Sequence, residues 1–367
     1  MKNILIKEFK DKRVLITGHT GFKGSWLSAW LELCGAKITG ISLDPPSKPS
    51  HFDLLDFNSF FSDCRIDIRD RRLIEEVFTQ SKPDFVFHLA AQPIVNRSYE
   101  NPTETHETNI VGTINVLESL SKLSNPCTAV FITSDKAYKN NEWEWGYRET
   151  DELGGNDPYS ASKAAAEIII KSYTESFFSK NTNIKIGIGR AGNVIGGGDW
   201  GEFRIIPDCI RSWSKKETTI LRNPKATRPW QHVLEPLSGY LYLAIALAND
   251  RSFHGHPFNF GPQQHTNHSV LDVVQSLSKF LPKFEWDIKP DSRNEYYESG
   301  LLKLNCDKAL MHLNWHAALS FPETIQFTAE WYKKYYLKKE IVTETTIDQI
   351  ETYMKIVDER LPKRFED

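Results

Sequence analysis

The first two thirds of the chain alternate short apolar runs with longer amphipathic stretches. The apolar runs begin near Arg13, Lys37, Arg65, Phe85, Ala129, Lys185 and Pro257. Several of them are apolar at consecutive positions, which is typical of strands covered by helices on both faces. Strands that alternate with helices in this way feed a parallel sheet. The pattern therefore predicts an α/β protein built on a doubly wound, Rossmann-type parallel sheet of about seven strands.

The stretches between these runs repeat their apolar residues at helical spacing. They predict helices over residues 23–33, 71–80, 108–121, 159–177 and 233–248. A further, charged helix is expected from Thr343, where it either covers the surface of its own chain or meets a partner chain.

The rhythm of strand and helix changes after Arg190. Three consecutive glycines, 196–198, precede a stretch rich in proline, arginine and tryptophan, and helix 233–248 then leads back to the last strand. This order predicts two interleaved parts. Residues 1–192 with about 232–262 are expected to form the nucleotide-binding domain. Residues from about 193–231 with 263–367 are expected to form a smaller C-terminal α/β lobe that binds the substrate.

Composition argues against several classes of function. The 367 residues are 40% hydrophobic and 25% charged, as in ordinary globular proteins, and the net charge of -3 provides no basic surface for nucleic acid. The first residues, MKNILIKEFKDKR, are polar, and no window holds the ~18 consecutive apolar residues of a membrane span. We therefore expect a cytoplasmic protein with neither nucleic acid nor membrane as a partner.

The five cysteines are scattered along the chain, at Cys34, Cys64, Cys127, Cys209 and Cys306. None of them is paired at the short spacing that metal sites use. They predict reduced, packed thiols and no metal site.

The segment RVLITGHTGFKGSWLSAWLELCGA places Gly18, Gly21 and Gly24 between a predicted strand and a predicted helix. Because these positions lack side chains, backbone amides at the start of the helix can approach a pyrophosphate. The third glycine also lets the helix pack closely on the strand. The segment predicts a dinucleotide site, and the alternative is a tight turn without a ligand.

Asp44 follows the second strand, about 20 residues beyond the last glycine. A carboxylate there accepts hydrogen bonds from the adenosine ribose and repels a 2′-phosphate, so NAD rather than NADP is the predicted cofactor. Alternatively, Asp44 only caps the proline turn that follows it. Asp67 is expected to border the adenine, and the small side chains of Ala90 and Ala91 leave room for the middle of the cofactor.

Tyr159 and Lys163 lie four residues apart in PYSASKAAAE, at the start of a predicted helix, so their side chains share a face. An ammonium group in that position favours the phenolate. The pair therefore predicts a tyrosine that takes a proton from a sugar hydroxyl as hydride leaves, and a lysine that also holds the nicotinamide ribose. This spacing also arises by chance, so its weight comes from the glycine segment upstream.

The fifth predicted strand ends in FITSDKAY, which presents Thr133, Ser134, Asp135 and Lys136 where a doubly wound sheet binds its ligands. An isolated Asp-Lys pair is usually a solvated surface pair. Two adjacent titratable groups at this edge of a sheet more often serve acid and base chemistry.

These motifs together resemble the extended short-chain dehydrogenase/reductase superfamily, and the longer segments are similar to its CDP-glucose 4,6-dehydratase branch. The general motifs TGHTGFKG and YSASK indicate the superfamily. The branch is indicated, over nearly the whole chain and in this order, by HLAAQP, TSDKAY, WGYRE, GGNDPYS, RAGNVIGGGDW, RIIPD, RPWQHVLEPLSGY and NFGP.

The resemblance implies three chemical steps on a nucleotide sugar, with CDP-glucose as the preferred substrate. Tyr159 would deprotonate the carbon-4 hydroxyl while hydride passes from carbon 4 to NAD. Removal of the carbon-5 proton would then let the carbon-6 hydroxyl leave as water, with Asp135 as the acid, before hydride returns to carbon 6. Lys136 would be either the carbon-5 base or a cation that stabilises the enolate. Ser134, or Thr133 beside it, would hydrogen-bond the carbon-4 oxygen.

The resemblance also implies further contacts and an assembly. Substrate contacts would be Gln92, Asn193, Arg204, Arg228, His232 and Glu298, with the two arginines on the diphosphate and with His232 and Glu298 alternatively structural. Further cofactor contacts would be Thr20, Phe22, Lys23, Ile68, Leu89, Thr108 and Thr133. A homodimer or homotetramer joined through helices is expected.

Three alternatives remain open from the sequence. The first is a 4,6-dehydratase for a dTDP, GDP or UDP sugar, because loops select the base. The second is a nucleotide-sugar epimerase, which needs only oxidation and return of hydride and has no need of the pair Asp135 and Lys136. The third is a catalytically silent NAD-binding partner protein.

Overall fold

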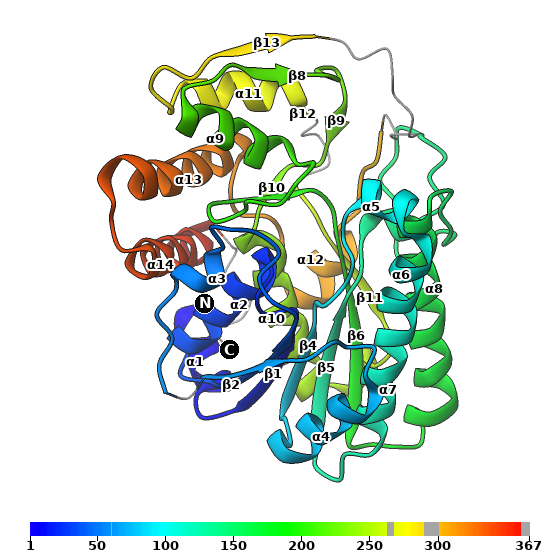
Figure 1. The fold of residues 1–367 in the computed structure, drawn as a ribbon. Coiled ribbons are helices and arrows are strands. Elements are labelled where there is room, and N and C mark those ends of the chain that lie inside the picture. Colours follow the sequence, from blue (N-terminus) through cyan, green and yellow to red (C-terminus); the bar gives the residue numbers. More distant parts are fainter. Residues whose placement is uncertain (60, 263–267, 290–300, 361–367) are drawn as a thin grey trace.

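The computed structural model describes residues 1–59, 61–262, 268–289 and 301–360. Its centre is a parallel sheet of seven strands in the order β11-β6-β5-β4-β1-β2-β3 (Figure 1). The strands are β1 (Arg13–Thr17), β2 (Lys37–Ser42), β3 (Phe61–Arg65), β4 (Phe85–His88), β5 (Cys127–Ile132), β6 (Ile184–Ala191) and β11 (Pro257–Phe260). The strand order reverses between β1 and β4. This confirms the predicted doubly wound, Rossmann-type fold, whose ligand crevice lies beyond the carboxyl ends of those two strands.

The third strand differs from its prediction. A strand was expected to begin near Arg65, but β3 covers Phe61–Arg65 and Arg65 is its last residue. β3 lies at the edge of the sheet and no residue in it is fully buried, so its own apolar signal is weak. The apolar residue that suggested a later strand, Ile68, instead packs against Gly112 at the start of α7 (Gly112–Ser121).

Neighbouring residues of the central strands point to opposite faces, and each face has its own apolar core. Val14 and Ile16 of β1 belong to one core, while Leu15 between them belongs to the other. The first core includes α1 (Lys2–Phe9), α2 (Phe22–Leu33), α10 (Leu234–Asn249) and α14 (Val342–Arg360), and it continues into a smaller group of elements beyond the carboxyl edge of the sheet. The helices of the second core are α4 (Arg71–Ser81), α7 and α8 (Pro158–Tyr173). The π turns η1 (Glu107–Val111) and η3 (Thr174–Phe178) extend α7 and α8 at one end each.

A smaller group of elements lies above the carboxyl edge of the sheet (Figure 1). It contains α9 (Ile205–Lys215), β8 (Thr219–Leu221), β9 (Thr227–Arg228), β12 (His268–Ser269), α11 (Val270–Ser278), β13 (Trp286–Ile288) and α13 (Phe321–Lys333). β8 pairs with β13 and β9 pairs with β12, so segments before and after β11 are interleaved. A further short pair joins β7 (Val194–Ile195) to β10 (Gln231–His232). Shorter elements are α3 (His51–Leu54), α5 (Val95–Glu100), α6 (Pro102–His106), η2 (Asp135–Ala137), η4 (Arg251–Phe253) and η5 (Lys334–Lys338).

Two late helices return to the sheet. α12 (Asp307–Leu313) packs beside β11, and α14 packs beside α2. The Lys2 ammonium lies 2.6 Å from the Glu351 carboxylate, which ties the first residues to α14. The charged helix expected from Thr343 therefore covers its own chain. None of the helices within the described residues is both long and apolar enough to cross a membrane.

Candidate active site

The glycine turn between β1 and α2 is shaped for close approach of a ligand to the backbone. Gly18 has φ +79°, and a Cβ there would lie 2.7 Å from the amide nitrogen of Ala90. A Cβ on Gly24 would lie 2.1 Å from the Gly18 carbonyl oxygen, so α2 packs directly on the turn. The residue before α2, Gly21, offers no side chain to cap the first amides of the helix. These amides fit a pyrophosphate, and the turn therefore fits NAD.

Asp44 lies just beyond β2 with its side chain 93% exposed, and its nearest charged neighbour is Arg65 at 3.6 Å. The Thr20 hydroxyl donates to the Leu43 carbonyl oxygen at 3.0 Å, which ties the end of β2 to the glycine turn. The Thr20 side chain is thus engaged within the protein, and the Asp44 carboxylate is the group left open to a ribose.

Asp67, expected to border the adenine, and two further predicted cofactor contacts, Ile68 and Thr108, follow β3 and β4 along the chain. Asp67 pairs with Arg69 at 2.6 Å, and this hydrogen bond lowers the pKa of Asp67. Ile68 is buried, and Thr108 is half-buried in the π turn η1.

The loop after β4 is held by hydrogen bonds from inside the protein. The Ala90 amide donates to the Thr17 hydroxyl at 3.2 Å. The Gln92 side chain donates to the Thr105 hydroxyl at 2.8 Å and accepts the Ile94 amide at 2.6 Å. Gln92, predicted to contact the substrate, therefore has its amide occupied by the loop that it shapes.

Tyr159 and Lys163 lie in the first turns of α8, where the Asp157 side chain accepts the Ser160 amide and Pro158 occupies the first position. Both side chains are buried. Burial raises the pKa of Tyr159 to about 12, and its interaction with the Ser134 hydroxyl opposes this. Burial lowers the pKa of Lys163 to about 8, opposed by the Glu167 carboxylate.

Asp135 begins the 3-10 turn η2, which Thr133 and Ser134 connect to the end of β5. Its side chain is buried, its Oδ1 accepts the Ser134 hydroxyl at 3.0 Å, and its buried Oδ2 has no hydrogen-bond partner within the described part of the chain. Burial raises the pKa of Asp135, whereas Lys136 beside it acts in the opposite direction. A carboxyl group in this state can keep a proton and deliver it.

Thr133 and Lys136 flank this acid differently. The Thr133 hydroxyl donates to Glu167 Oε1 at 2.6 Å, so it points into the protein. Lys136 is half-buried, and its amide donates to the Ser134 hydroxyl at 3.2 Å. Of the two predicted contacts for the carbon-4 oxygen, Ser134 is therefore the one that reaches Tyr159.

The predicted substrate contacts Asn193, Arg204 and Arg228 lie beyond residue 192, and the charge of Arg204 acts on this cluster. Arg204 binds Asp199 at 3.0 Å, and this carboxylate raises the pKa of Arg204, whose charge in turn acts on Tyr159. Arg228 is buried and donates to the Thr227 carbonyl oxygen at 2.8 Å. Asn193 is half-buried.

Neither of the last two predicted substrate contacts, His232 and Glu298, is placed at the site. His232 is fully buried between the rings of Trp26 and Phe327, at centroid distances of 6.0 and 5.5 Å, and burial lowers its pKa to about 3. This placement fits the structural alternative for His232, a neutral packing residue. Glu298 lies outside the described residues.

Tyr240 of α10 was not anticipated. Its hydroxyl is buried without a hydrogen-bond partner among the described residues, and the charges of Tyr159 and Asp135 act on it. The Lys23 ammonium lies 6.0 Å from the Tyr240 ring centroid and also interacts with Asp135. An aromatic residue in the apolar stretch LSGYLYLAIAL is typical of a core helix, so the sequence offered no signal for this position.

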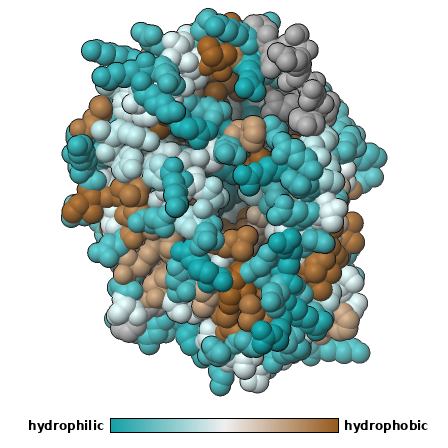
Figure 2. Space-filling model, viewed as in Figure 1, coloured by the Kyte–Doolittle hydropathy of each residue, from teal (hydrophilic) through white to brown (hydrophobic). Residues whose placement is uncertain are grey.

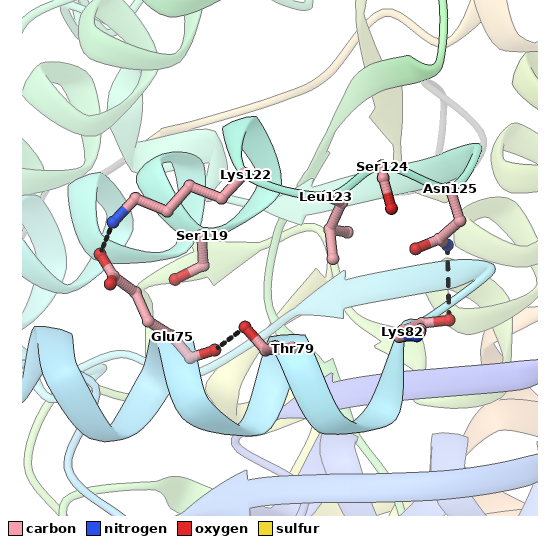
Figure 3. Close-up of a pocket in the computed structure, with 8 residues that line it drawn as sticks. All are labelled: Glu75, Thr79, Lys82, Ser119, Lys122, Leu123, Ser124 and Asn125. Atoms are coloured by element: carbon pink, nitrogen blue, oxygen red, sulfur yellow. Dashed lines mark hydrogen bonds and ion pairs between the residues drawn. The ribbon is translucent and has the colours of Figure 1, made fainter.

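A separate pocket lies at the opposite, amino edge of the sheet, where α4 and α7 end (Figure 3). Its side chains include the ion pair between Glu75 and Lys122, and it contains none of the predicted site residues. The candidate active site is therefore the cluster at the carboxyl edge.

Residues 14–261 match the model of the family described as the NAD dependent epimerase/dehydratase family. The chain belongs to this family. The match confirms the predicted superfamily and the NAD dependence that characterises it.

Similar proteins divide between dehydratases and epimerases of this family. A CDP-glucose 4,6-dehydratase from Salmonella typhimurium is 44% identical over 330 residues, which cover 89% of this chain and 91% of the relative. A CDP-paratose 2-epimerase from Salmonella typhi is 29% identical over 73% of this chain and 84% of its own. Among solved structures, a dTDP-glucose 4,6-dehydratase from Bacillus anthracis in complex with NAD has a TM-score of 0.71 at 20% identity, covering 89% of this chain and 98% of that one. The 44% identity agrees with the predicted CDP-glucose 4,6-dehydratase branch, and the solved structure shows the shared fold.

Proposed function

We propose that the protein is a hydro-lyase that converts CDP-glucose to CDP-4-keto-6-deoxyglucose with NAD as its cofactor. The observation that carries this is Asp135, a buried acid with a raised pKa one residue from the serine that reaches Tyr159. An epimerase has no leaving hydroxyl to protonate. The similarity to the Salmonella dehydratase supports both the reaction and the CDP sugar.

The first step falls to Tyr159 and Ser134. With NAD bound, the positive nicotinamide ring would oppose the burial that raises the pKa of Tyr159 to about 12, and the phenolate would take the proton of the carbon-4 hydroxyl. The Ser134 hydroxyl, which donates to Asp135 Oδ1, would turn to donate to the oxygen that becomes the ketone. Bound NAD would accept the hydride from carbon 4 and return it to carbon 6. The neighbouring Lys163 ammonium stabilises the phenolate and would hold the nicotinamide ribose.

The second step falls to Asp135 and Lys136. The carbon-4 ketone acidifies the proton on carbon 5, and its removal releases the carbon-6 hydroxyl, which Asp135 protonates so that it leaves as water. A proton returns to carbon 5 as hydride reaches carbon 6, which gives the saturated 4-keto-6-deoxy sugar. Lys136 lies beside the acid and serves either as the carbon-5 base or as a cation for the enolate. Arg204 and Arg228 would bind the diphosphate, with Asn193 beside them, and hold the hexose over the acid.

Enzyme and substrate can be tested together. Purified protein would be incubated with NAD and with CDP-, dTDP-, GDP- or UDP-glucose, and the base-labile absorbance of a 4-keto sugar would be measured. We expect the signal with CDP-glucose and a signal at least tenfold weaker with the others, which corresponds to about 1.4 kcal/mol of discrimination. A stronger signal with a dTDP, GDP or UDP sugar would show that the substrate carries that base and not cytosine. No signal with any of the four sugars would refute the proposed reaction.

We further propose a homodimer joined through α7, α8 and their π turns. Val111, Ile168 and Phe177 on these elements are 42%, 59% and 59% exposed, and Figure 2 shows apolar side chains gathered at this edge of the molecule. Burying such side chains favours association. Mass measurement by light scattering should give twice the chain mass for the parent and one chain mass for Ile168→Lys. A monomeric parent would contradict the dimer.

The chain divides into a part that would bind NAD and a part that would bind the nucleotide sugar. Residues 1–192 with about 232–262 would bind NAD, and about 193–231 with most of 263–341 would bind the nucleotide sugar. The packing of α12 and α14 beside β11 and α2 favours assigning these two helices to the NAD-binding part.

A further inference from the structure

A fully buried ion pair contacts both ends of the acid turn, the segment of residues 133–138 that carries Asp135. Arg190 of β6 donates from Nε to Glu167 Oε1 at 2.8 Å and to Oε2 at 2.9 Å, and its Nη2 also contacts Oε2. The side chains are 3% and 2% exposed. Each charge in such a pair depends on the other, because a single charge at this depth would be uncompensated.

The carboxylate of this pair joins two catalytic elements. Glu167 follows Lys163 by four residues and Tyr159 by eight on α8, so all three lie on one face of the helix. Its Oε1 accepts the Thr133 hydroxyl at 2.6 Å. Glu167 thereby fixes the helix that presents the phenol to the end of the strand that presents the acid.

The guanidinium of the pair holds the far side of the same turn. Arg190 Nη1 donates to the Tyr138 hydroxyl at 2.6 Å and to the Glu149 carbonyl oxygen at 3.2 Å. The Tyr138 hydroxyl in turn donates to Asn259 Oδ1 at 2.7 Å. Tyr138 directly follows η2, just as Thr133 and Ser134 directly precede it.

We propose that Glu167 and Arg190 are positioning residues that set the distance between the Tyr159 phenol and the Asp135 carboxyl. Thr133 and Tyr138 are the two contacts through which the pair holds the acid turn. This inference rests on the function proposed above, in which both groups act on one hexose. Because displacement by about 1 Å can cost about a hundredfold in rate, a turn held at both ends is needed for the water-loss step.

The test removes single hydroxyl groups and leaves the ion pair in place. Thr133→Val and Tyr138→Phe should each lower kcat at least about tenfold, with KM and the NAD dissociation constant within about twofold of the parent. Thr133→Ser, which keeps the hydroxyl, should recover most of the rate. Tyr353→Phe is the matched control, because it removes a hydroxyl that donates to another buried carboxylate, Glu235, at 2.7 Å. It should leave kcat unchanged.

A kinetic isotope effect separates positioning from simple loss of folded protein. A displaced acid turn slows water loss more than oxidation. In Thr133→Val and Tyr138→Phe the isotope effect with carbon-5 deuterated CDP-glucose should therefore rise, and the effect with carbon-4 deuterated CDP-glucose should fall. Loss of active enzyme alone would lower kcat and leave both isotope effects at their parent values, which would overturn the inference.

Two outcomes remain distinguishable beyond this. Tyr138→Phe is the decisive variant, because its hydroxyl is bound to Arg190 and Asn259 rather than directed at the substrate. If only Thr133→Val changed the isotope effects, Thr133 would contact the substrate directly and the positioning role would be refuted. If the parent were inactive on every nucleotide hexose, the proposed function itself would fail.

Discussion

Glu235 allows a prediction whose size follows from the structure. It lies near the start of α10, is 1% exposed, and burial raises its pKa to about 7. The carboxyl accepts the Ala318 amide at 2.9 Å, the Leu319 amide at 2.6 Å and the Tyr353 hydroxyl at 2.7 Å. Its contacts are neutral donors, and the nearest guanidinium, Arg360, binds Glu323 instead. The charged form is therefore disfavoured.

The sign and the size of the effect follow from this raised pKa. In the unfolded chain the carboxyl loses its proton near pH 4.5, whereas in the folded chain it keeps the proton until about pH 7. The folded state thus binds more protons between these values, and the free energy of unfolding falls as the pH rises through this window. At roughly 1.4 kcal/mol for each tenfold change in proton affinity, the total loss is about 3 kcal/mol.

The perturbation is Glu235→Gln, which imitates the protonated acid. The Gln carbonyl oxygen can accept the two amides, and its NH2 can donate to the Tyr353 oxygen, whose proton can turn to Ser238 at 2.9 Å. Urea unfolding followed by tryptophan fluorescence would be measured for parent and variant at pH 4.5 and pH 8. We expect the stability of the variant relative to the parent to increase by about 3 kcal/mol between these pH values. An equal difference at both would refute the assigned protonation.

The remaining predictions concern the site. Tyr159→Phe should abolish oxidation of carbon 4 while NAD still binds, as measured by calorimetry. Asp135→Asn should oxidise normally but lose water about a hundredfold more slowly, and it should lose the decline in rate that the parent shows as the pH rises past the raised pKa of the acid. Asp44→Asn removes the charge that repels a 2′-phosphate. The ratio of the NADP dissociation constant to the NAD dissociation constant should therefore fall at least about tenfold. Tyr240→Phe should lower kcat about threefold to tenfold, because the Tyr240 hydroxyl has no hydrogen-bond partner among the described residues and can bond a group in the occupied site. An unchanged kcat would show that Tyr240 serves packing alone.

Local signals in the chain were sufficient for the sheet and for the nucleotide turn. Apolar runs in the sequence indicate the positions of six strands of the sheet: β1, β2, β4, β5, β6 and β11. Gly18 and Gly24 indicate a tight turn in which there is no room for a side chain. Tyr159 and Lys163 share a helix face because of their spacing alone. In each case the signal lies in residues that are close together in the sequence or in a pattern that repeats along it.

Contacts between distant segments were decided only by the tertiary structure. Thr133 and Glu167 are 34 residues apart, and nothing in FITSDKAY indicates that this hydroxyl turns inward while that of Ser134 meets the phenol. His232 resembles a ligand residue in sequence, but the packing of Trp26 and Phe327 encloses it.

The amino-acid sequence by itself therefore determined the order of strands and helices, the cofactor turn and the identities of the phenol, the ammonium and the acid. Which of the neighbouring polar groups face a substrate, and which instead hold the site together, was decided by the fold. The physical reason is that burial and long-range hydrogen bonds depend on which distant segments the fold brings into contact. Glu167, Arg190 and Tyr240 meet the site from three different elements, and no periodicity within one segment encodes such contacts.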